Sequence, residues 1–105
     1  MDAIASVSHH FSSGVYAKEI CFPAGSSGGK HVHDFDHLSI LAAGTVKLSV
    51  DGVETIITAP HCVTVMAGKA HVVTAVTDAV WYCIHATDET DPDEVDQALI
   101  EKGGR

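Results

Sequence analysis

Histidine is the residue type in this sequence that is best suited to chemistry, and its spacing is unusual. Eight of the 105 residues are histidines. Three of them, His31, His33 and His37, fall in the short stretch HVHDFDH. Imidazole nitrogen is a good ligand for Zn, Cu, Fe and Ni. The cluster therefore predicts a binding site for one divalent transition metal ion, although the residue types do not choose between these metals.

The spacing of the three histidines restricts the local structure that could bring them to one ion. In a helix, His33 and His37 share a face but His31 does not. In one straight strand all three share a face, but the strand between the outer two spans about 20 Å. Nitrogens on one ion lie only roughly 3 Å apart. We therefore expect a strand that carries His31 and His33, a turn over residues 34–36, and a second strand that begins near His37.

A fourth histidine, His71, is the best candidate to complete the site. It follows the turn-like stretch MAGKA and opens the apolar run HVVTAV. A sheet could bring this strand beside the strands of the first three histidines.

Short strands predict the framework that positions these histidines. The runs VYAKEICF, HLSILAA, TVKLSV, CVTVMAG and VWYCIHA are rich in β-formers and are separated by Gly, Pro or Asp. Asp51 and Gly52 lie between two alternating apolar runs, which predicts a hairpin with a two-residue turn. Val46, Leu48 and Val50 should then share a face with Val53, Thr55 and Ile57. The pattern favours an all-β antiparallel sandwich or barrel.

The last residues have a different pattern and predict one short helix over about residues 92–102. Asp91 is a suitable N-cap, and Pro92 suits the first helical position. Glu94 follows three residues after the cap, and Gly103 is a suitable stop.

Composition limits the classes of function. A chain of 105 residues predicts one domain. Its formal charge is −8, with only six Lys and Arg, so nucleic acid is not an expected partner. The cysteines, Cys21, Cys62 and Cys83, form no CxxC pair, which favours reduced thiols and a cytoplasmic location. No signal peptide and no apolar stretch long enough to cross a membrane are recognisable.

One stretch around the histidines resembles the first cupin motif, G-x5-HxH-x3,4-E-x6-G. The matching residues are Gly25, His31, His33, His37 and Gly44. The sequence departs from the motif at His37, where the family usually has Glu.

The second cupin motif, G-x5-PxG-x2-H-x3-N, is matched more loosely. Gly68 and His71 have the expected spacing, but Met66 replaces the usual Pro and Ala75 replaces the Asn. The resemblance implies a double-stranded β-helix, or jelly-roll, barrel over about residues 11–87. It also implies one divalent metal ion inside this barrel, held by His31, His33, His37 and His71.

Other candidate residues surround this site. His85 shares a strand face with Trp81 and Cys83. These three residues are therefore candidates for lining the interior of the barrel and for contacting either the metal ligands or a substrate. For the remaining residues we expect less specific roles: His9 and His10 at the surface, His61 structural at a strand entrance, and Asp34 and Asp36 as solvated turn residues or hydrogen-bond acceptors for an imidazole.

The leading hypothesis is a mononuclear metal cupin that acts on a small oxygenated molecule, as a dioxygenase or related enzyme. The alternative is a binding module in which the metal anchors a small ligand or stabilises the barrel. Metal-free isomerase chemistry of the sugar-nucleotide type ranks last, since it needs interior cations for phosphates. A homodimer is expected, because small barrels with an open edge tend to pair.

Overall fold

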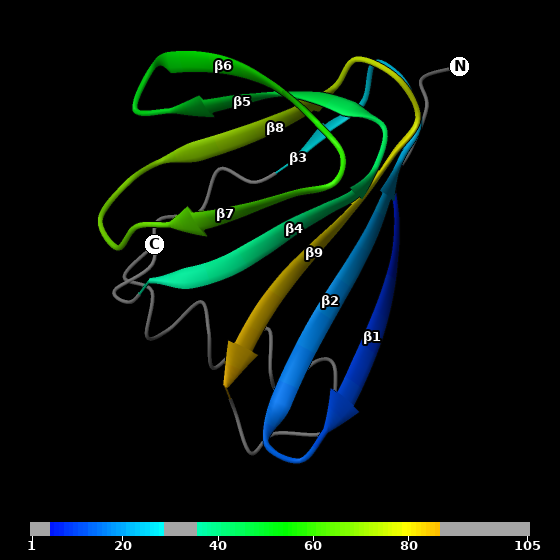
Figure 1. Cartoon of the computed structure of the whole chain (residues 1–105), viewed down its shortest axis with the longest axis vertical. Coiled ribbons are helices and arrows are strands. Elements are labelled where there is room, and N and C mark those ends of the chain that lie inside the picture. Colours follow the sequence, from blue (N-terminus) through cyan, green and yellow to red (C-terminus); the bar gives the residue numbers. More distant parts are fainter. Residues whose placement is uncertain (1–4, 29–35, 87–105) are drawn as a thin grey trace.

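The computed structural model describes residues 5–28 and 36–86, and these residues form nine β-strands in two sheets (Figure 1). The strands are β1 (Ser6–Ser12), β2 (Val15–Phe22), β3 (Ser27–Gly28), β4 (His37–Ala43), β5 (Thr45–Val50), β6 (Val53–Thr58), β7 (His61–Val65), β8 (His71–Ala75) and β9 (Ala79–Ala86). The predicted C-terminal helix over residues 92–102 lies outside the described residues, as do His31 and His33.

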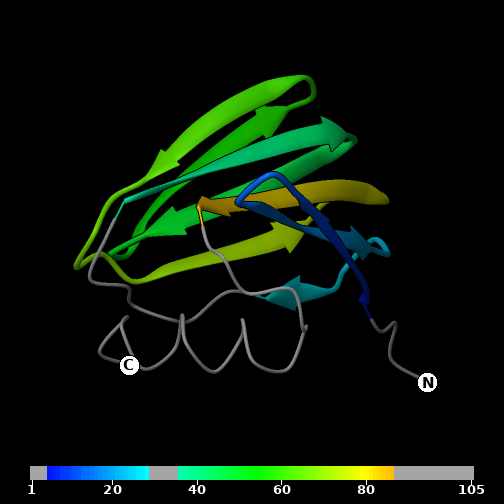
Figure 2. The same ribbon diagram turned by 90° about the horizontal axis from the view of Figure 1, so that it is seen from below.

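The two sheets face each other, with the four-stranded sheet above the five-stranded sheet in Figure 1, and they overlap in the view from below (Figure 2). The five-stranded sheet has the order β1-β2-β9-β4-β7, and the four-stranded sheet has the order β3-β8-β5-β6. Every strand pair is antiparallel. The all-β class and the jelly-roll type of arrangement that the sequence predicted are confirmed for the described residues.

The Asp51-Gly52 hairpin is confirmed with the predicted register. Val50 pairs with Val53 across the turn, and Val46 pairs with Ile57 further along. Both turn residues have positive φ, 48° for Asp51 and 85° for Gly52, as a turn that matches the twist of two strands requires.

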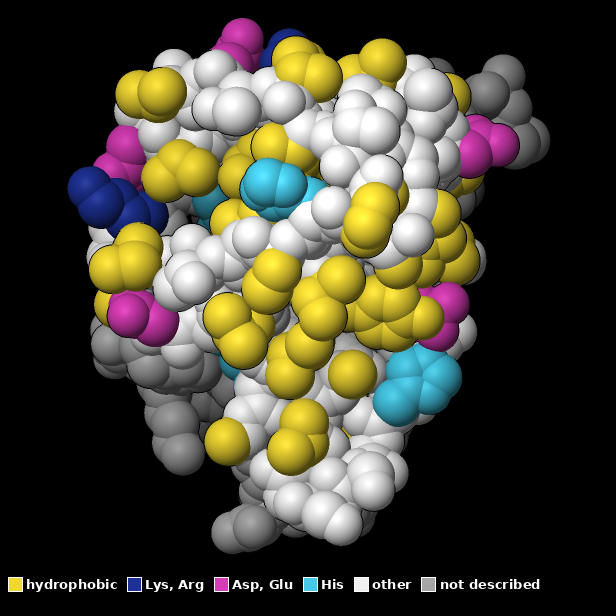
Figure 3. Space-filling model, viewed as in Figure 1, with side chains coloured by type: hydrophobic (Ala, Val, Ile, Leu, Met, Phe, Trp, Pro, Cys, Tyr) yellow, Lys and Arg dark blue, Asp and Glu magenta, His cyan; other side chains and the backbone are white. Residues whose placement is uncertain are grey.

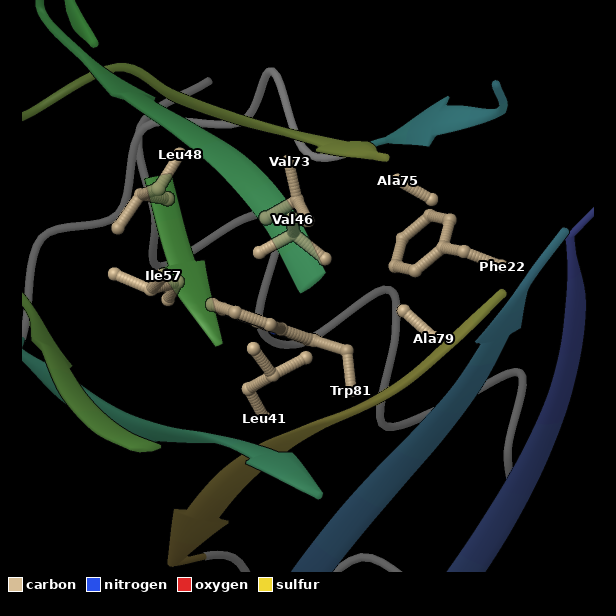
Figure 4. Packing of buried hydrophobic residues seen from close by; sticks show 9 residues of the cluster. All are labelled: Phe22, Leu41, Val46, Leu48, Ile57, Val73, Ala75, Ala79 and Trp81. Carbon is tan, nitrogen blue, oxygen red and sulfur yellow. The ribbon is translucent and has the colours of Figure 1, made fainter. Parts of the chain in front are cut away.

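The apolar core lies between the sheets at one end of the strands (Figure 4). Trp81 and Leu41 contribute from the five-stranded sheet and are almost wholly buried. Val46, Ile57 and Val73 meet them from the four-stranded sheet. Because side chains alternate along a strand, this packing fixes which face of each strand points inward. The inward positions are the odd-numbered residues of β4 and β9 and the even-numbered residues of β2.

Gly44 joins β4 to β5 at the apolar end. Its φ is +87°, and a Cβ atom there would collide with the carbonyl oxygen of Asp78. This position therefore admits only glycine, which gives a physical reason for the last residue of the sequence motif.

Candidate functional site

The inward faces of the strands become polar away from the apolar core. On β4, His37 and Ser39 precede the core residue Leu41, and all three are buried. On β9, Cys83 and His85 follow the core residue Trp81 on the same face. The same alternation that buries the apolar side chains at one end therefore directs polar side chains inward at the other.

Three imidazoles meet at this polar end, and we call His37, His71 and His85 the histidine cluster. Each has an exposed fraction of 7% or less. The ring centroids of His37 and His71 lie 6.0 Å apart, and those of His37 and His85 lie 4.5 Å apart. His71 comes from the four-stranded sheet and the other two come from the five-stranded sheet. The fold thus brings together residues far apart in the sequence.

The geometry of His37 and His71 fits a shared metal ion. With metal–nitrogen bonds of about 2.1 Å, two imidazoles on one ion have centroids roughly 4.5–6.5 Å apart, depending on the bond angle. Within residues 5–28 and 36–86, no three His, Cys, Asp or Glu side chains are arranged to hold an ion. Of the four expected ligands, His37 and His71 lie in the described part of the chain. The other two, His31 and His33, belong to residues outside it.

Of the bend expected over residues 34–36, the structure describes only Asp36. The strands that flank it, β3 and β4, belong to different sheets.

Two aspartates hold the turn that precedes His71. The backbone N–H of Ala67 donates to Asp36 Oδ1 at 2.7 Å, and the N–H of Ala70 donates to Asp51 Oδ1 at 2.8 Å. Asp36 directly precedes His37, so the first bond ties the start of β4 to the turn before β8. In the described structure Asp36 accepts a backbone N–H bond, a role that the sequence did not predict. Asp51 was recognised only as a turn residue, and its second role depends on a tertiary contact.

Trp81 and Cys83 differ in their surroundings although they share a strand face. Trp81 is 1% exposed and packs within the apolar core. Burial raises the pKa of the Cys83 thiol, while Ser39, Trp81 and the positive charge of Lys18 act in the opposite direction. Cys83 therefore lies where the apolar core meets the polar end, between Trp81 and His85.

The structure adds Tyr16 to the site, which the sequence analysis did not single out. Tyr16 is completely buried, and its ring stacks on His85 with centroids 6.2 Å apart. Its hydroxyl group is 2.7 Å from His9 Nδ1. A signal was present in the sequence, because Tyr16 and Phe22 occupy positions of the same parity in one β-rich run.

The surface role expected for the two N-terminal histidines holds for only one of them. His10 is exposed and bonds Glu19 on the outer face at 2.8 Å. His9 is only partly exposed and points to the opposite face, toward Tyr16. The expectation for His9 was wrong because β1 pairs with β2, and strand alternation then separates the two rings. His61 is exposed at the start of β7.

A family profile described as the cupin domain matches residues 18–85. The chain belongs to the cupin family. The match covers most of the two sheets and includes all three members of the histidine cluster. No curated protein matches the sequence of this cupin.

Solved structures support the same fold. An RmlC-like cupin from Shewanella frigidimarina has a TM-score of 0.71 at 22% identity, over 86% of this chain and 80% of that one. A predicted oxalate decarboxylase from Thermotoga maritima has a TM-score of 0.69 at 18% identity, over 79% and 80%. A variant of salicylate 1,2-dioxygenase from Pseudoaminobacter salicylatoxidans, in complex with gentisate, has a TM-score of 0.71 at 10% identity, over 90% and 27%. At these identities the likeness shows the fold alone.

Among the described residues, no helix is long and apolar enough to cross a membrane.

Proposed function

We propose that this cupin binds one divalent transition metal ion through His31, His33, His37 and His71. In this proposal the ion holds a small, oxygen-rich anion at the polar end of the barrel. The main support is the proximity of His37 and His71: these buried imidazoles come from opposite sheets, and their ring centroids lie 6.0 Å apart. The motif spacing of His31 and His33 supports their inclusion.

The charge of the ligand set indicates what the ion would bind. Four neutral imidazoles leave the 2+ charge of the ion uncompensated. A six-coordinate ion would keep two open positions, which favours anionic ligands with two oxygens, such as carboxylates or enolates. When bound, the ion would supply a Lewis acid that polarises such an oxygen. The histidine cluster and Ser39 would surround the ligand on the inner face of the five-stranded sheet.

The class of chemistry that we propose is a dioxygenase or a related metal-dependent reaction on a small oxygenated acid. Two of the structural neighbours have names that concern such acids, oxalate in one and salicylate and gentisate in the other. The alternative is a binding module that holds the same class of ligand without transforming it. The two differ in whether the Fe(II)-loaded protein consumes oxygen in the presence of a 1,3-dicarbonyl, a catechol or a thiol acid.

Metal analysis of protein purified without a histidine tag tests the metal site. We expect about one ion per chain after reloading and a large loss of affinity in a His33→Ala, His71→Ala double variant. His61→Ala is the matched control, because His61 is an exposed histidine at the start of β7. Wild-type protein that retains no metal after reloading would contradict the proposal, and so would a double variant that binds as tightly as the control.

We also propose that this cupin forms a homodimer. The outer face of the five-stranded sheet is rich in hydrophobic side chains, which gather at the centre of the view in Figure 3. Leu38 and Val15 on this sheet are 48% and 46% exposed. Among the described strands, β1 lies at the edge of this sheet, and an edge strand can pair with a second copy. Light scattering should give twice the chain mass of 11.0 kDa, and a monomer mass at micromolar concentration would contradict the proposal.

A further inference from the structure

A row of aromatic rings crosses the five-stranded sheet beside the histidine cluster. Phe11 of β1, Tyr16 of β2, His85 of β9 and His37 of β4 follow one another in the order of the strands (Figure 1). Phe11 pairs with Tyr16, and Tyr16 pairs with His85, so these side chains lie on the same face of the sheet. That face is the inner one, because Tyr16 and His85 are buried. We call these four residues the aromatic row.

The rings of the aromatic row contact one another. The ring centroids lie 5.0 Å apart for Phe11 and Tyr16, 6.2 Å apart for Tyr16 and His85, and 4.5 Å apart for His85 and His37. Distances of about 4.5–7 Å are those of aromatic pairs in direct contact. Because His37 is a proposed metal ligand, only two ring contacts separate Tyr16 from this ligand.

The hydroxyl group of Tyr16 has a base beside it. The Tyr16 hydroxyl oxygen lies 2.7 Å from His9 Nδ1, and the two ring planes differ by 15°. When the imidazole is neutral, the phenol O–H donates and Nδ1 accepts, because the phenol is the more acidic of the two groups. The hydroxyl proton therefore lies on a short path to a nitrogen that can take it up.

Tyr16 and His9 differ in their exposure to solvent. Tyr16 is completely buried, whereas His9 is partly exposed. A phenol that loses an electron becomes a strong acid, and a charge left within the barrel would be costly. Transfer of the hydroxyl proton to His9 leaves a neutral phenoxyl group inside and places the positive charge where water can reach it. Burial also keeps solutes away from the phenoxyl group, which would otherwise react with them.

We propose that Tyr16 is a redox-active tyrosine that supplies one electron to the metal position. Its O–H bond breaks, the proton forms a bond to His9 Nδ1, and the electron leaves along the aromatic row through His85 and His37. The oxidant is hydrogen peroxide. One peroxide molecule takes one electron from Fe(II) in the histidine site and one from Tyr16, and it is thereby reduced to two hydroxide ions. The transfer needs only the bond to His9, whatever other contacts Tyr16 makes.

This inference rests on the proposed function for its metal and adds an activity that the binding of a small anion does not require. The electron from Tyr16 would spare His37 from oxidation, because His37 lies next to the place where peroxide reacts. A reductant such as ascorbate would then restore the phenol, since one electron enters the ring and the proton returns from His9.

Freeze-quenched EPR spectra of the Fe(II)-loaded protein test this, after hydrogen peroxide is added without substrate. We expect a tyrosyl radical, whose spectrum narrows when the protein contains ring-deuterated tyrosine. A radical on the buried Trp81 would not respond to this labelling. The signal should be lost in Tyr16→Phe and retained in Tyr82→Phe. Tyr82 is the matched control, because it is the second of the two tyrosines and lies on the outer face of the sheet.

The role of His9 is tested against its neighbour in the chain. His9→Gln keeps a hydrogen-bond acceptor beside Tyr16 but removes the base, and it should lower the yield of the radical several-fold. His10→Gln is the control, because His10 lies on the outer face and bonds Glu19, and it should leave the yield unchanged. A bond between Tyr16 and His9 that served stability alone would give equal yields in the two variants.

A metal-free experiment separates this inference from the proposed metal site. Ruthenium(III) tris-bipyridine, generated by a light flash, takes one electron from the protein in the Tyr82→Phe background. It should produce the Tyr16 radical with the same dependence on His9. A tyrosyl signal that survives in Tyr16→Phe, equal yields in His9→Gln and wild type, or no tyrosyl radical after the flash would overturn the inference and leave the metal proposal intact. Protein that binds no iron would instead refute the metal proposal and the reaction with peroxide.

Discussion

The hydrogen bond between Ala67 and Asp36 allows a sharp test of how the site is held together. It is 2.7 Å long and joins the residue before His37 to the turn that precedes His71. Asp36→Ala removes the acceptor. The acceptor is charged but exposed, so we expect the free energy of unfolding to fall by about 1 kcal/mol.

The loss of this hydrogen bond should also weaken metal binding. In the variant, binding through His37 and His71 must also order the turn before β8. If this ordering costs about 1 kcal/mol, the metal affinity falls about fivefold, since 1.4 kcal/mol corresponds to a factor of ten. Asp36→Asn keeps an acceptor oxygen at the same place and should show a smaller loss of both stability and affinity.

A matched control lies at the opposite end of the barrel. Asp78 Oδ1 accepts the backbone N–H of Ala24 at 2.9 Å, and its carbonyl oxygen lies beside Gly44. Asp78→Ala should lose a similar free energy of unfolding but keep the wild-type metal affinity. Urea denaturation of the metal-free proteins and competitive Zn²⁺ titrations provide the two measurements. If Asp36→Ala and Asp78→Ala bind metal equally well, the reasoning is refuted.

Four further predictions concern the core, the thiols and the ligand set. Gly44→Ala should lower the free energy of unfolding by about 1–3 kcal/mol more than Gly52→Ala in urea denaturation, since both have positive φ but only Gly44 lacks space for a Cβ atom; equal losses would contradict this. Burial raises the pKa of the Cys83 thiol, so iodoacetamide should label exposed Cys62 much faster by mass spectrometry near pH 8, and rapid labelling of both would refute it. The pKa of the Cys83 thiol is higher in the folded than in the unfolded protein. The buried thiol therefore makes its full contribution to the free energy of unfolding below the unfolded pKa, and this contribution is lost as the pH rises through the folded pKa. We expect the free energy of unfolding to fall less at alkaline pH in Cys83→Ala than in the wild type. His37→Glu should retain the metal but bind azide more weakly, whereas His37→Ala should bind metal more weakly; azide curves identical to wild type in both would exclude His37 as a ligand.

The sequence alone was sufficient to predict the fold class and several local features. Alternating apolar residues and the Asp51-Gly52 turn are local signals, so the β5–β6 hairpin and its register followed from them. The glycine and histidine spacing indicated the family that the profile match later showed. The same spacing identified His37 and His71 as candidate site residues, because they occupy histidine or ligand positions of the two motifs.

Only the tertiary structure decided which other side chains share the interior with these histidines. The contact between Tyr16 and His85 depends on the pairing of β2 with β9, two strands that are distant in the sequence, and the contact between Tyr16 and His9 depends on the pairing of β1 with β2. From the sequence, Asp36 was expected to be a solvated turn residue. In the structure its carboxylate accepts a hydrogen bond from the turn between β7 and β8. A strand pattern shows which residues share a face. The pairing of distant strands then determines which faces meet, because hydrophobic burial and backbone hydrogen bonding are satisfied over the whole barrel at once.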